Sequence, residues 1–161
     1  MNKFQQSQKG KIFKPDFERH DQAQRPHHSA LCVHCGAFYQ AGHWSWQDQV
    51  PLEVESVTCP ACQRIADDEP AGVVHLSGSF LRGHQDEVLS LIRHTEAHEK
   101  AEHALERILK VHNFDDHMEV TTTGIHLANR IGHALNAAYK GTSQYHYSDN
   151  DTRVSVSWQR D

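Results

Sequence analysis

Two pairs of cysteines are the residues in this sequence most clearly suited to chemistry. Twenty-three residues separate the pairs, which lie in the segments Cys32-Val33-His34-Cys35-Gly36 and Cys59-Pro60-Ala61-Cys62. Each Cys-x-x-Cys pair lets two thiolates reach one ion from a single tight turn, and two such turns complete a tetrahedron. The sequence therefore predicts one structural zinc ion, bound by Cys32, Cys35, Cys59 and Cys62.

The residues around the cysteines fit this role. Gly36 suits a turn that needs positive φ, and Pro60 stiffens the second turn. His34 could replace a cysteine as a ligand, but four cysteines already suffice. Four thiolates leave no position for water or substrate, and no nucleophile elbow, phosphate loop or carboxylate pair stands out. We therefore expect a non-enzymatic protein.

The compartment expected for this chain also favours zinc over disulfides. The sequence has no apolar run of the ~20 residues that span a bilayer, and its first residues lack the apolar stretch of a signal peptide. We expect a soluble, cytoplasmic protein with no membrane contact, where thiols stay reduced. A redox sensor that releases zinc and forms two disulfides is the alternative interpretation.

Aromatic side chains are dense between the cysteine pairs, where Phe38, Tyr39, Trp44 and Trp46 occur. They could stack on unpaired bases, each contact contributing about 1–3 kcal/mol, or they could form the small core of the ribbon. Arg64 is the cationic side chain of this region, which also contains several acidic residues. We take Trp44, Trp46 and Arg64 as candidate RNA-binding residues.

Fifteen histidines raise the question of a second metal site. His94 and His98 stand at i, i+4 with His103 nearby, a spacing that can hold a metal. The favoured interpretation is a solvated helix face, and the same holds for His126 and His133.

Residues 1–30 form a basic arm with a net charge of +3, while the remainder of the chain carries −8. This composition is too polar to offset the entropy of ordering, so the arm is predicted to be disordered. It could contact a polyanion or serve as a solubilising tail. The candidate RNA-binding cations of the arm are Lys9, Lys11, Lys14, Arg19 and Arg25.

Two ordered regions follow the arm and together predict an α+β fold. Residues 31–66 read as a small β ribbon held by zinc, with a β-prone stretch at 52–58. Residues 72–161 read as a βα-βα-ββ module. Its first strand covers 72–76, and a helical region over 84–112 comprises two helices or one interrupted helix.

The second half of this module has clearer periodicity. A strand is predicted at 118–123, then a helix after Gly124 that ends near Gly141. Tyr145 and Tyr147 alternate with polar residues before a polar turn, and alternation returns at 154–158. This pattern predicts an antiparallel hairpin with one buried face.

The cysteine segments, with Tyr39, Gly42 and Trp44, resemble a zinc ribbon of the nonsense-mediated-decay protein 3 family, the export adaptors of the large ribosomal subunit. The chain also resembles small bacterial proteins built on the same plan. The similarity continues weakly through 105–131. The resemblance implies association with the ribosome or RNA without enzymatic activity. It does not imply nuclear export, because the export adaptors have more cysteine pairs and further domains.

Two functions follow as hypotheses. The first is a zinc-ribbon protein that binds the ribosome or structured RNA. In this hypothesis the basic arm attracts the RNA electrostatically, and the ribbon positions the protein on it. The second is a zinc-stabilised protein–protein adaptor in a stress-response or transcription complex, favoured by the charge of −8 outside the arm.

Overall fold

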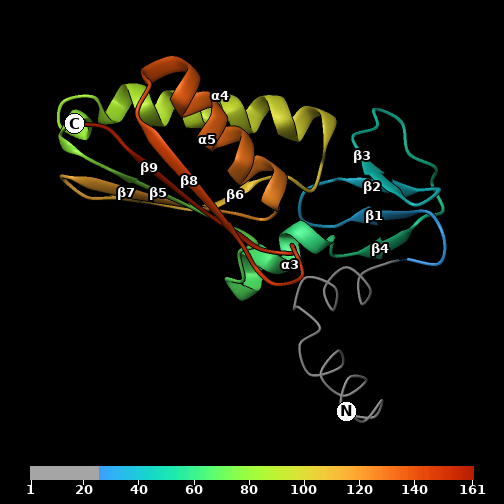
Figure 1. Ribbon diagram of the computed structural model, residues 1–161. Helices are drawn as coiled ribbons and strands as arrows, with labels where there is room; N and C mark the ends of the chain where they lie inside the picture. The colour runs from blue at the N-terminus through green and yellow to red at the C-terminus, as the bar shows by residue number, and fades with distance from the viewer. Residues whose placement is uncertain (1–25) are drawn as a thin grey trace, which may run out of the picture.

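The computed structural model describes residues 26–161, which form two β-sheets with their helices (Figure 1). The first sheet has the strand order β3-β2-β1-β4. Its strands are β1 (Ala30–Cys32), β2 (Phe38–Gln40), β3 (His43–Ser45) and β4 (Glu55–Val57). β1 pairs in parallel with β4, and the other two neighbouring pairs are antiparallel. We call residues 30–67, including the helix that follows β4, the ribbon.

Helix α3 (Pro60–Asp67) completes the ribbon. Cys59 is its N-cap, with extended backbone angles and a sulfur that accepts the Cys62 N–H, and proline occupies the first turn, where its missing N–H has no cost. Gly36 has φ +80°, as predicted for the first turn. The two cysteine pairs therefore lie on different local structures, a β turn and a helix N-terminus.

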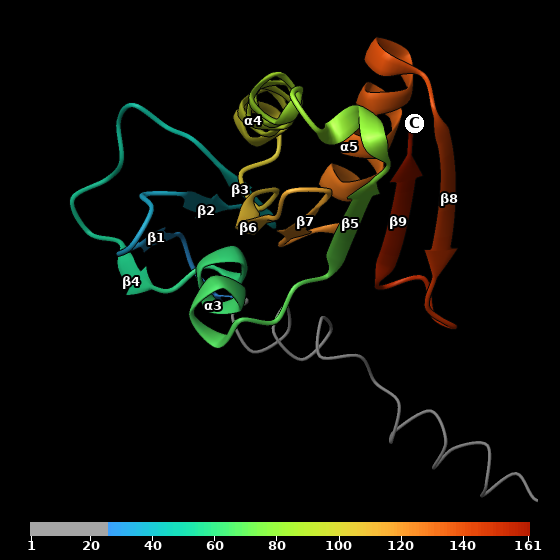
Figure 2. The same cartoon turned by 90° about the vertical axis from the view of Figure 1, so that its left-hand side faces the viewer.

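The second sheet has the order β6-β7-β5-β9-β8. Its strands are β5 (Gly72–Ser77), β6 (Ile108–Asn113), β7 (His117–Thr122), β8 (Thr142–Tyr147) and β9 (Val154–Gln159). Its helices are α4 (Gln85–Glu102), α5 (Ile125–Tyr139) and the short 3-10 turn η1 (Ser79–Leu81). Both α4 and α5 cover one face of this sheet, and Figure 2, which looks along α4, shows α5 beside β9. We call residues 72–161 the second module.

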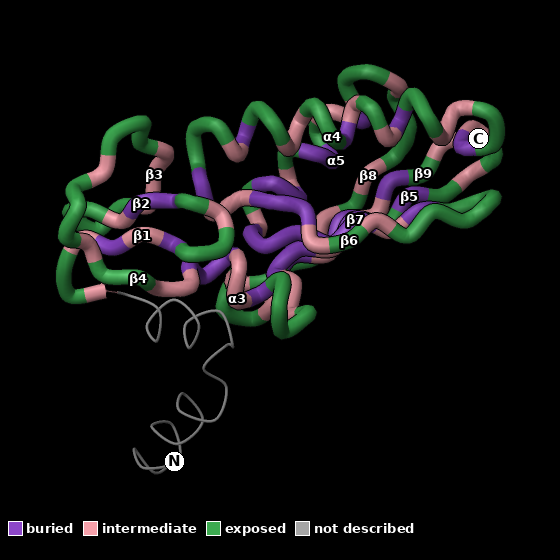
Figure 3. The backbone as a smooth tube through the Cα atoms, turned by 180° about the vertical axis from the view of Figure 1, so that it is seen from behind, coloured by how far each residue is buried: buried purple, intermediate pink, exposed green. Residues whose placement is uncertain are grey.

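The core of the second module lies between this sheet and the two helices. Alternate residues of β5 and β9 point into it, so the buried segments follow the central strands in Figure 3. Trp158 is fully buried, and its Nε1 donates to the Lys140 carbonyl at 2.7 Å. Leu127, Ile131 and Leu135 contribute the buried face of α5. Burying one such side chain stabilises the fold by about 1.5–3 kcal/mol.

Several sequence predictions are confirmed here. The structure is an α+β fold whose predicted strand at 118–123 corresponds to β7. The helix after Gly124 is α5, and Gly141, with φ +101°, follows its end. β8 and β9 pair as the predicted antiparallel hairpin, but the buried face is confirmed only for β9, where Val154, Val156 and Trp158 are buried; on β8 no residue is fully buried, and Tyr147 is half-exposed.

The helical region predicted over 84–112 is wrong in its second half. α4 is one continuous helix that includes the polar residues 93–100, and it ends where His103 turns to extended angles. Residues 108–113 instead form β6, which pairs with β7. The cause is non-local: as a strand, this segment buries Ile108 in the core and satisfies its backbone groups against β7. The module is therefore βα-ββα-ββ rather than βα-βα-ββ.

The arm predicted over 1–30 lies outside the described residues up to residue 25, and Ala30 already belongs to β1. Among the described helices, none combines the length and the apolar character that a bilayer-crossing segment needs.

Candidate metal centre

The four cysteine sulfurs converge on one point. Cys32 ends β1, Cys35 follows in the turn, Cys59 caps α3 and Cys62 lies in its first turn. All four Sγ atoms lie within 4.8 Å of one another, and all four thiols are free. The Sγ atoms of Cys35 and Cys59 are 3.7 Å apart, close to the edge of about 3.8 Å expected for a tetrahedron with 2.3 Å zinc–sulfur bonds. The site thus fits one zinc ion, as the sequence predicted.

Backbone amides point at three of these sulfurs. The N–H of Ala37 donates to Cys35 Sγ at 3.4 Å, and that of Cys59 donates to Cys32 Sγ at 3.3 Å. The N–H of Cys62 donates to Cys59 Sγ, also at 3.3 Å. Such bonds favour the thiolate, the form that binds a metal. The local backbone is therefore built to hold negative sulfur.

The thiols of Cys35 and Cys59 behave as a pair that shares a proton. The hydrogen bond from Cys59 lowers the pKa of Cys35 to about 4. The same bond, together with burial, raises the pKa of Cys59 well above its ordinary value. Burial also raises the pKa of Cys62, although Arg107 partly opposes this. A metal ion that binds here must displace the protons that remain.

Arg107 contacts three of the four sulfurs, although it lies 45 residues beyond the last cysteine. Its Nη2 donates to Cys59 Sγ at 3.0 Å and to Cys35 Sγ at 3.3 Å, and its Nη1 donates to Cys62 Sγ at 3.3 Å. Its Nε donates to the Ala104 carbonyl, which fixes the guanidinium. The side chain is 6 % exposed. Arg107 therefore links the second module directly to the metal centre.

The charges of this contact are complementary. Burial acts to lower the pKa of Arg107, but electrostatic interaction with the sulfurs of Cys59 and Cys35 raises it above its ordinary value, so the guanidinium stays charged. Zinc with four thiolates carries a net charge of −2. One buried cation halves this charge, which reduces the cost of removing the centre from water.

Trp46 forms the other side of this contact between the ribbon and the second module. Its Nε1 donates to the Lys100 carbonyl near the end of α4 at 2.7 Å. The Arg107 guanidinium lies 5.9 Å from the centre of its ring, and the Lys100 ammonium lies 5.6 Å away. Cation–π geometry on this ring adds to the apolar contact. Trp46 thus packs the ribbon against the second module, a structural role that extends beyond the small ribbon core expected from the sequence.

Arg64 is also part of the packing. It is 2 % exposed, and its Nη1 donates to the Glu69 carbonyl at 2.7 Å. The structure therefore places this candidate RNA-binding cation inside the protein. The candidates of the arm, Lys9, Lys11, Lys14, Arg19 and Arg25, lie outside the described residues.

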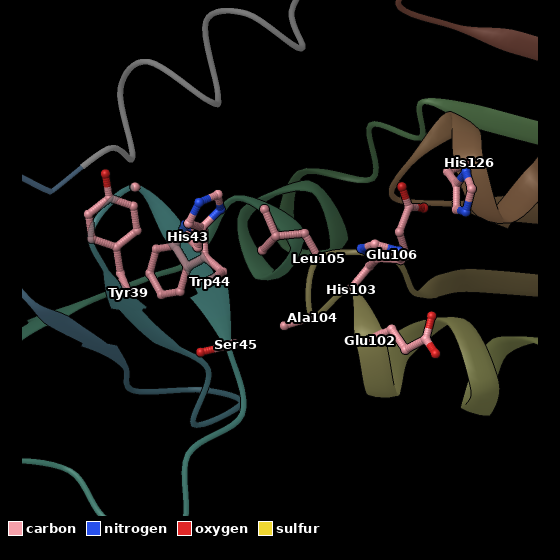
Figure 4. Close-up of a pocket in the computed structure, with 11 residues that line it drawn as sticks. Tyr39, His43, Trp44, Ser45, Glu102, His103, Ala104, Leu105, Glu106 and His126 are labelled. Atoms are coloured by element: carbon pink, nitrogen blue, oxygen red, sulfur yellow. The ribbon is translucent and has the colours of Figure 1, made fainter.

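Trp44 lies on a cavity of about 580 Å³ between the ribbon and the second module (Figure 4). One wall is the β2–β3 hairpin, and the other is the segment that joins α4 to β6 together with the start of α5. The cavity is lined by Tyr39, Gly42, His43, Trp44, Ser45, Glu102, His103, Ala104, Leu105, Glu106 and His126. This mixture of aromatic, imidazole and carboxylate groups suits a ligand with both a flat apolar face and polar edges.

Glu106 is the most buried carboxylate of this cavity. Burial raises its pKa, and the Leu127 N–H, which donates to Glu106 Oε2 at 3.1 Å, opposes the rise only in part. Sequence reasoning missed both Glu106 and Arg107 as site residues. No spacing rule could have found them, because their partners lie in other elements.

No family model matches the sequence, and a comparison with curated proteins finds no match. The fold and the site together define an α+β protein with four free cysteines placed to bind one metal ion, an arrangement consistent with zinc. A metal ion bound by all four sulfurs would have a closed coordination shell, the arrangement found in structural zinc sites.

Proposed function

We propose that this protein binds RNA, in particular unpaired nucleotides of structured RNA such as that of the ribosome, and that its zinc centre serves this binding rather than catalysis. One observation carries the proposal: the basic arm joins the described chain beside the aromatic cavity. Pro26, the first described residue, lines a hollow together with Tyr39 and Gly42, and these two residues also line the cavity. The described chain thus begins beside the stacking surface, and the lysines and arginines of the arm precede Pro26 in the sequence.

The aromatic pair on the hairpin supports base stacking. The ring centres of Tyr39 and Trp44 lie 5.3 Å apart with a tilt of 56°. These side chains project from paired positions of β2 and β3, which hold them in place without a ligand. Aromatic side chains stack on bases with little sequence preference, and each stacked base contributes about 1–3 kcal/mol. Glu102 and Glu106 on the opposite wall could accept hydrogen bonds from base amino groups.

Charge determines where the phosphates bind. Residues 31–161 carry a net charge of −8, which repels a polyanion, so attraction must come from the arm with its six lysines and arginines. If all six neutralised a phosphate, the slope of log K against log salt would reach about −4 for single-stranded RNA. Binding is therefore expected to be salt-dependent and to need the arm.

The ribosome as the site of this RNA rests on the resemblance of the ribbon to that of the export adaptors, which is carried by the cysteine framework with Tyr39, Gly42 and Trp44. The structural support for the ribosome as the target is limited to the four cysteines, whose sulfurs cluster as they do in a zinc ribbon.

Fluorescence anisotropy with a labelled single-stranded RNA, together with co-sedimentation with ribosomes at low salt, tests the proposal. We expect Trp44→Ala to weaken RNA binding roughly 5- to 150-fold, in line with one lost stacking contact of about 1–3 kcal/mol. Alanine at the five arm candidates should remove most binding and flatten the salt dependence. Phe114→Ala is the matched control, since Phe114 is a half-exposed aromatic outside the cavity. A full-length protein that neither binds RNA nor co-sediments contradicts the proposal.

A protein–protein adaptor is the second candidate, and the charge of −8 over residues 31–161 favours it. Copurification from cells separates the two. Partners that survive nuclease treatment favour the adaptor, and partners lost on nuclease treatment favour RNA binding.

A further inference from the structure

Three potential metal ligands meet at the edge of the cavity, apart from the four cysteines. Glu99 lies in the last turn of α4, His103 directly follows that helix, and His126 lies in the first turn of α5. One ligand atom from each lies within 4.8 Å of the others. The residues come from two helices, so their meeting depends on the packing of α4 against α5. The sequence placed His103 and His126 on solvated surfaces, and it gave no sign that they meet.

One pair of these ligand atoms has nearly the spacing that a metal site requires. His126 Nε2 and Glu99 Oε2 are 3.0 Å apart, whereas ligands about 2.0–2.1 Å from a tetrahedral zinc ion lie about 3.3 Å from each other. The rings of His103 and His126 have centres 5.4 Å apart and planes at 77°. Both imidazoles are exposed, so their rings have room to turn toward a shared ion.

The carboxylate is already oriented by a neighbour. Arg130 Nε donates to Glu99 Oε1 at 3.0 Å, which leaves Oε2 directed at His126. The Glu99 side chain is about 5 % exposed, so it keeps this orientation. Metal ligands in proteins are commonly held in this way by a second residue that binds the other ligand atom.

We propose that Glu99, His103 and His126 bind a second divalent ion, Zn²⁺, with the remaining coordination position open to the cavity. Two imidazoles and one carboxylate are a ligand set of open zinc sites, which keep water or another small ligand in the fourth position. His103 and His126 both line the cavity, so a fourth ligand would approach from there, beside Glu106 (Figure 4). This site differs in kind from the closed centre of four sulfurs.

The alternative is a cluster of ion pairs, in which Glu99 is neutralised by Arg130 and by a protonated His126. That arrangement needs no metal and gives His103 no part in it. The number of ions bound per chain therefore separates the two interpretations.

Metal content provides the test, with purified full-length protein dialysed against buffered zinc under reducing conditions. We expect two zinc ions per chain in the wild type and one in His103→Ala and in His126→Ala. His98→Ala on α4 and His133→Ala on α5 are matched controls, because both histidines are exposed and lie outside the cluster, and both variants should keep two. One ion in the wild type, or two in both ligand variants, overturns the proposal. The ion that remains at the cysteines reports that each variant is folded.

Cobalt substitution tests the open position. Co²⁺ at the cysteines gives intense sulfur-to-metal charge-transfer bands, while Co²⁺ at a nitrogen and oxygen site gives only weak d–d bands. Azide added to the fully loaded protein should shift the weak bands and leave the charge-transfer bands unchanged. Weak bands that do not respond to azide would overturn the open position. Neither experiment involves RNA, so its outcome is independent of the function proposed above.

Discussion

The ribbon and the second module are held together in different ways. The second module buries a large apolar cluster in which Val74, Leu127 and Trp158 are fully covered. The buried cluster at the ribbon consists of two cysteines and three alanines, one of which, Ala104, belongs to the second module. Such small side chains exclude little apolar area from water. We therefore expect the ribbon to depend on a bound metal, on Arg107 and on the partly buried Trp44 and Trp46 that pack against this cluster, whereas the second module can depend on its core.

Removal of zinc should cause the largest loss of stability, and this loss should be confined to the ribbon. A structural zinc site contributes on the order of 10 kcal/mol to the folding of small modules. With a chelator and a reductant, we expect amide protons of the ribbon to lose protection from hydrogen exchange, while those of β5, β7 and β9 keep it. Equal loss in both regions, or no loss in the ribbon, would contradict the comparison.

Trp158→Ala should cause the next largest loss of stability, and this loss should affect the second module. Loss of a fully buried tryptophan destabilises a core by about 3–5 kcal/mol, and here the Lys140 carbonyl also loses its donor. Urea unfolding should show this loss in the second module with the zinc content unchanged. Phe114→Ala, at a half-exposed position, should change little. A variant that loses zinc at native conditions would show that the ribbon depends on this core.

Arg107→Met tests the contact between the two regions. Removal of hydrogen bonds to charged sulfur should cost about 1.5–3 kcal/mol, and loss of a residue that orients metal ligands should weaken zinc affinity roughly 10- to 100-fold. Competition with a chelator measures the affinity. Arg93→Met is the control, since that side chain is 54 % exposed and pairs only with Glu96 in the described part of the chain. Equal affinities of the two variants would remove Arg107 from the metal centre.

The smallest expected change in stability is that of a Glu106 substitution, and it depends on pH. Burial raises the pKa of this carboxyl, so the folded protein prefers its neutral form, and its contribution to stability falls as pH rises above the ordinary value of 4.5. Glu106→Gln should therefore stabilise the protein at neutral pH, and the difference from wild type should vanish below pH 4.5. Zinc release in acid affects both proteins alike. Glu102→Gln, on an exposed residue, should show no such difference.

Local patterns explain which parts of the fold were predictable. Each cysteine pair is defined within four residues, and the hairpin of β8 and β9 follows from strict alternation on both sides of one turn. The segment at 108–113 was not predictable in this way. Leu105, Ile108 and Leu109 have helical spacing, but pairing with β7 decides the outcome, and β7 comes later in the chain.

The site residues also fall into two groups, those that the sequence predicts and those that only the tertiary structure brings together. The four cysteines were predictable because sequence spacing alone brings each pair to a metal. Arg107 and the cluster of Glu99, His103 and His126 were not, because the packing of separate elements brings them together. Arg64 shows the converse: its charge suggested a surface role, but tertiary packing buries it.

X-ray absorption at the zinc edge tests the central claim most directly, with the His126→Ala variant used so that only the four-cysteine centre contributes. The structure predicts a single shell of four sulfurs at about 2.3 Å. A shell with fewer sulfurs, one that includes nitrogen or oxygen, or a protein that binds far less than one zinc per chain would contradict it.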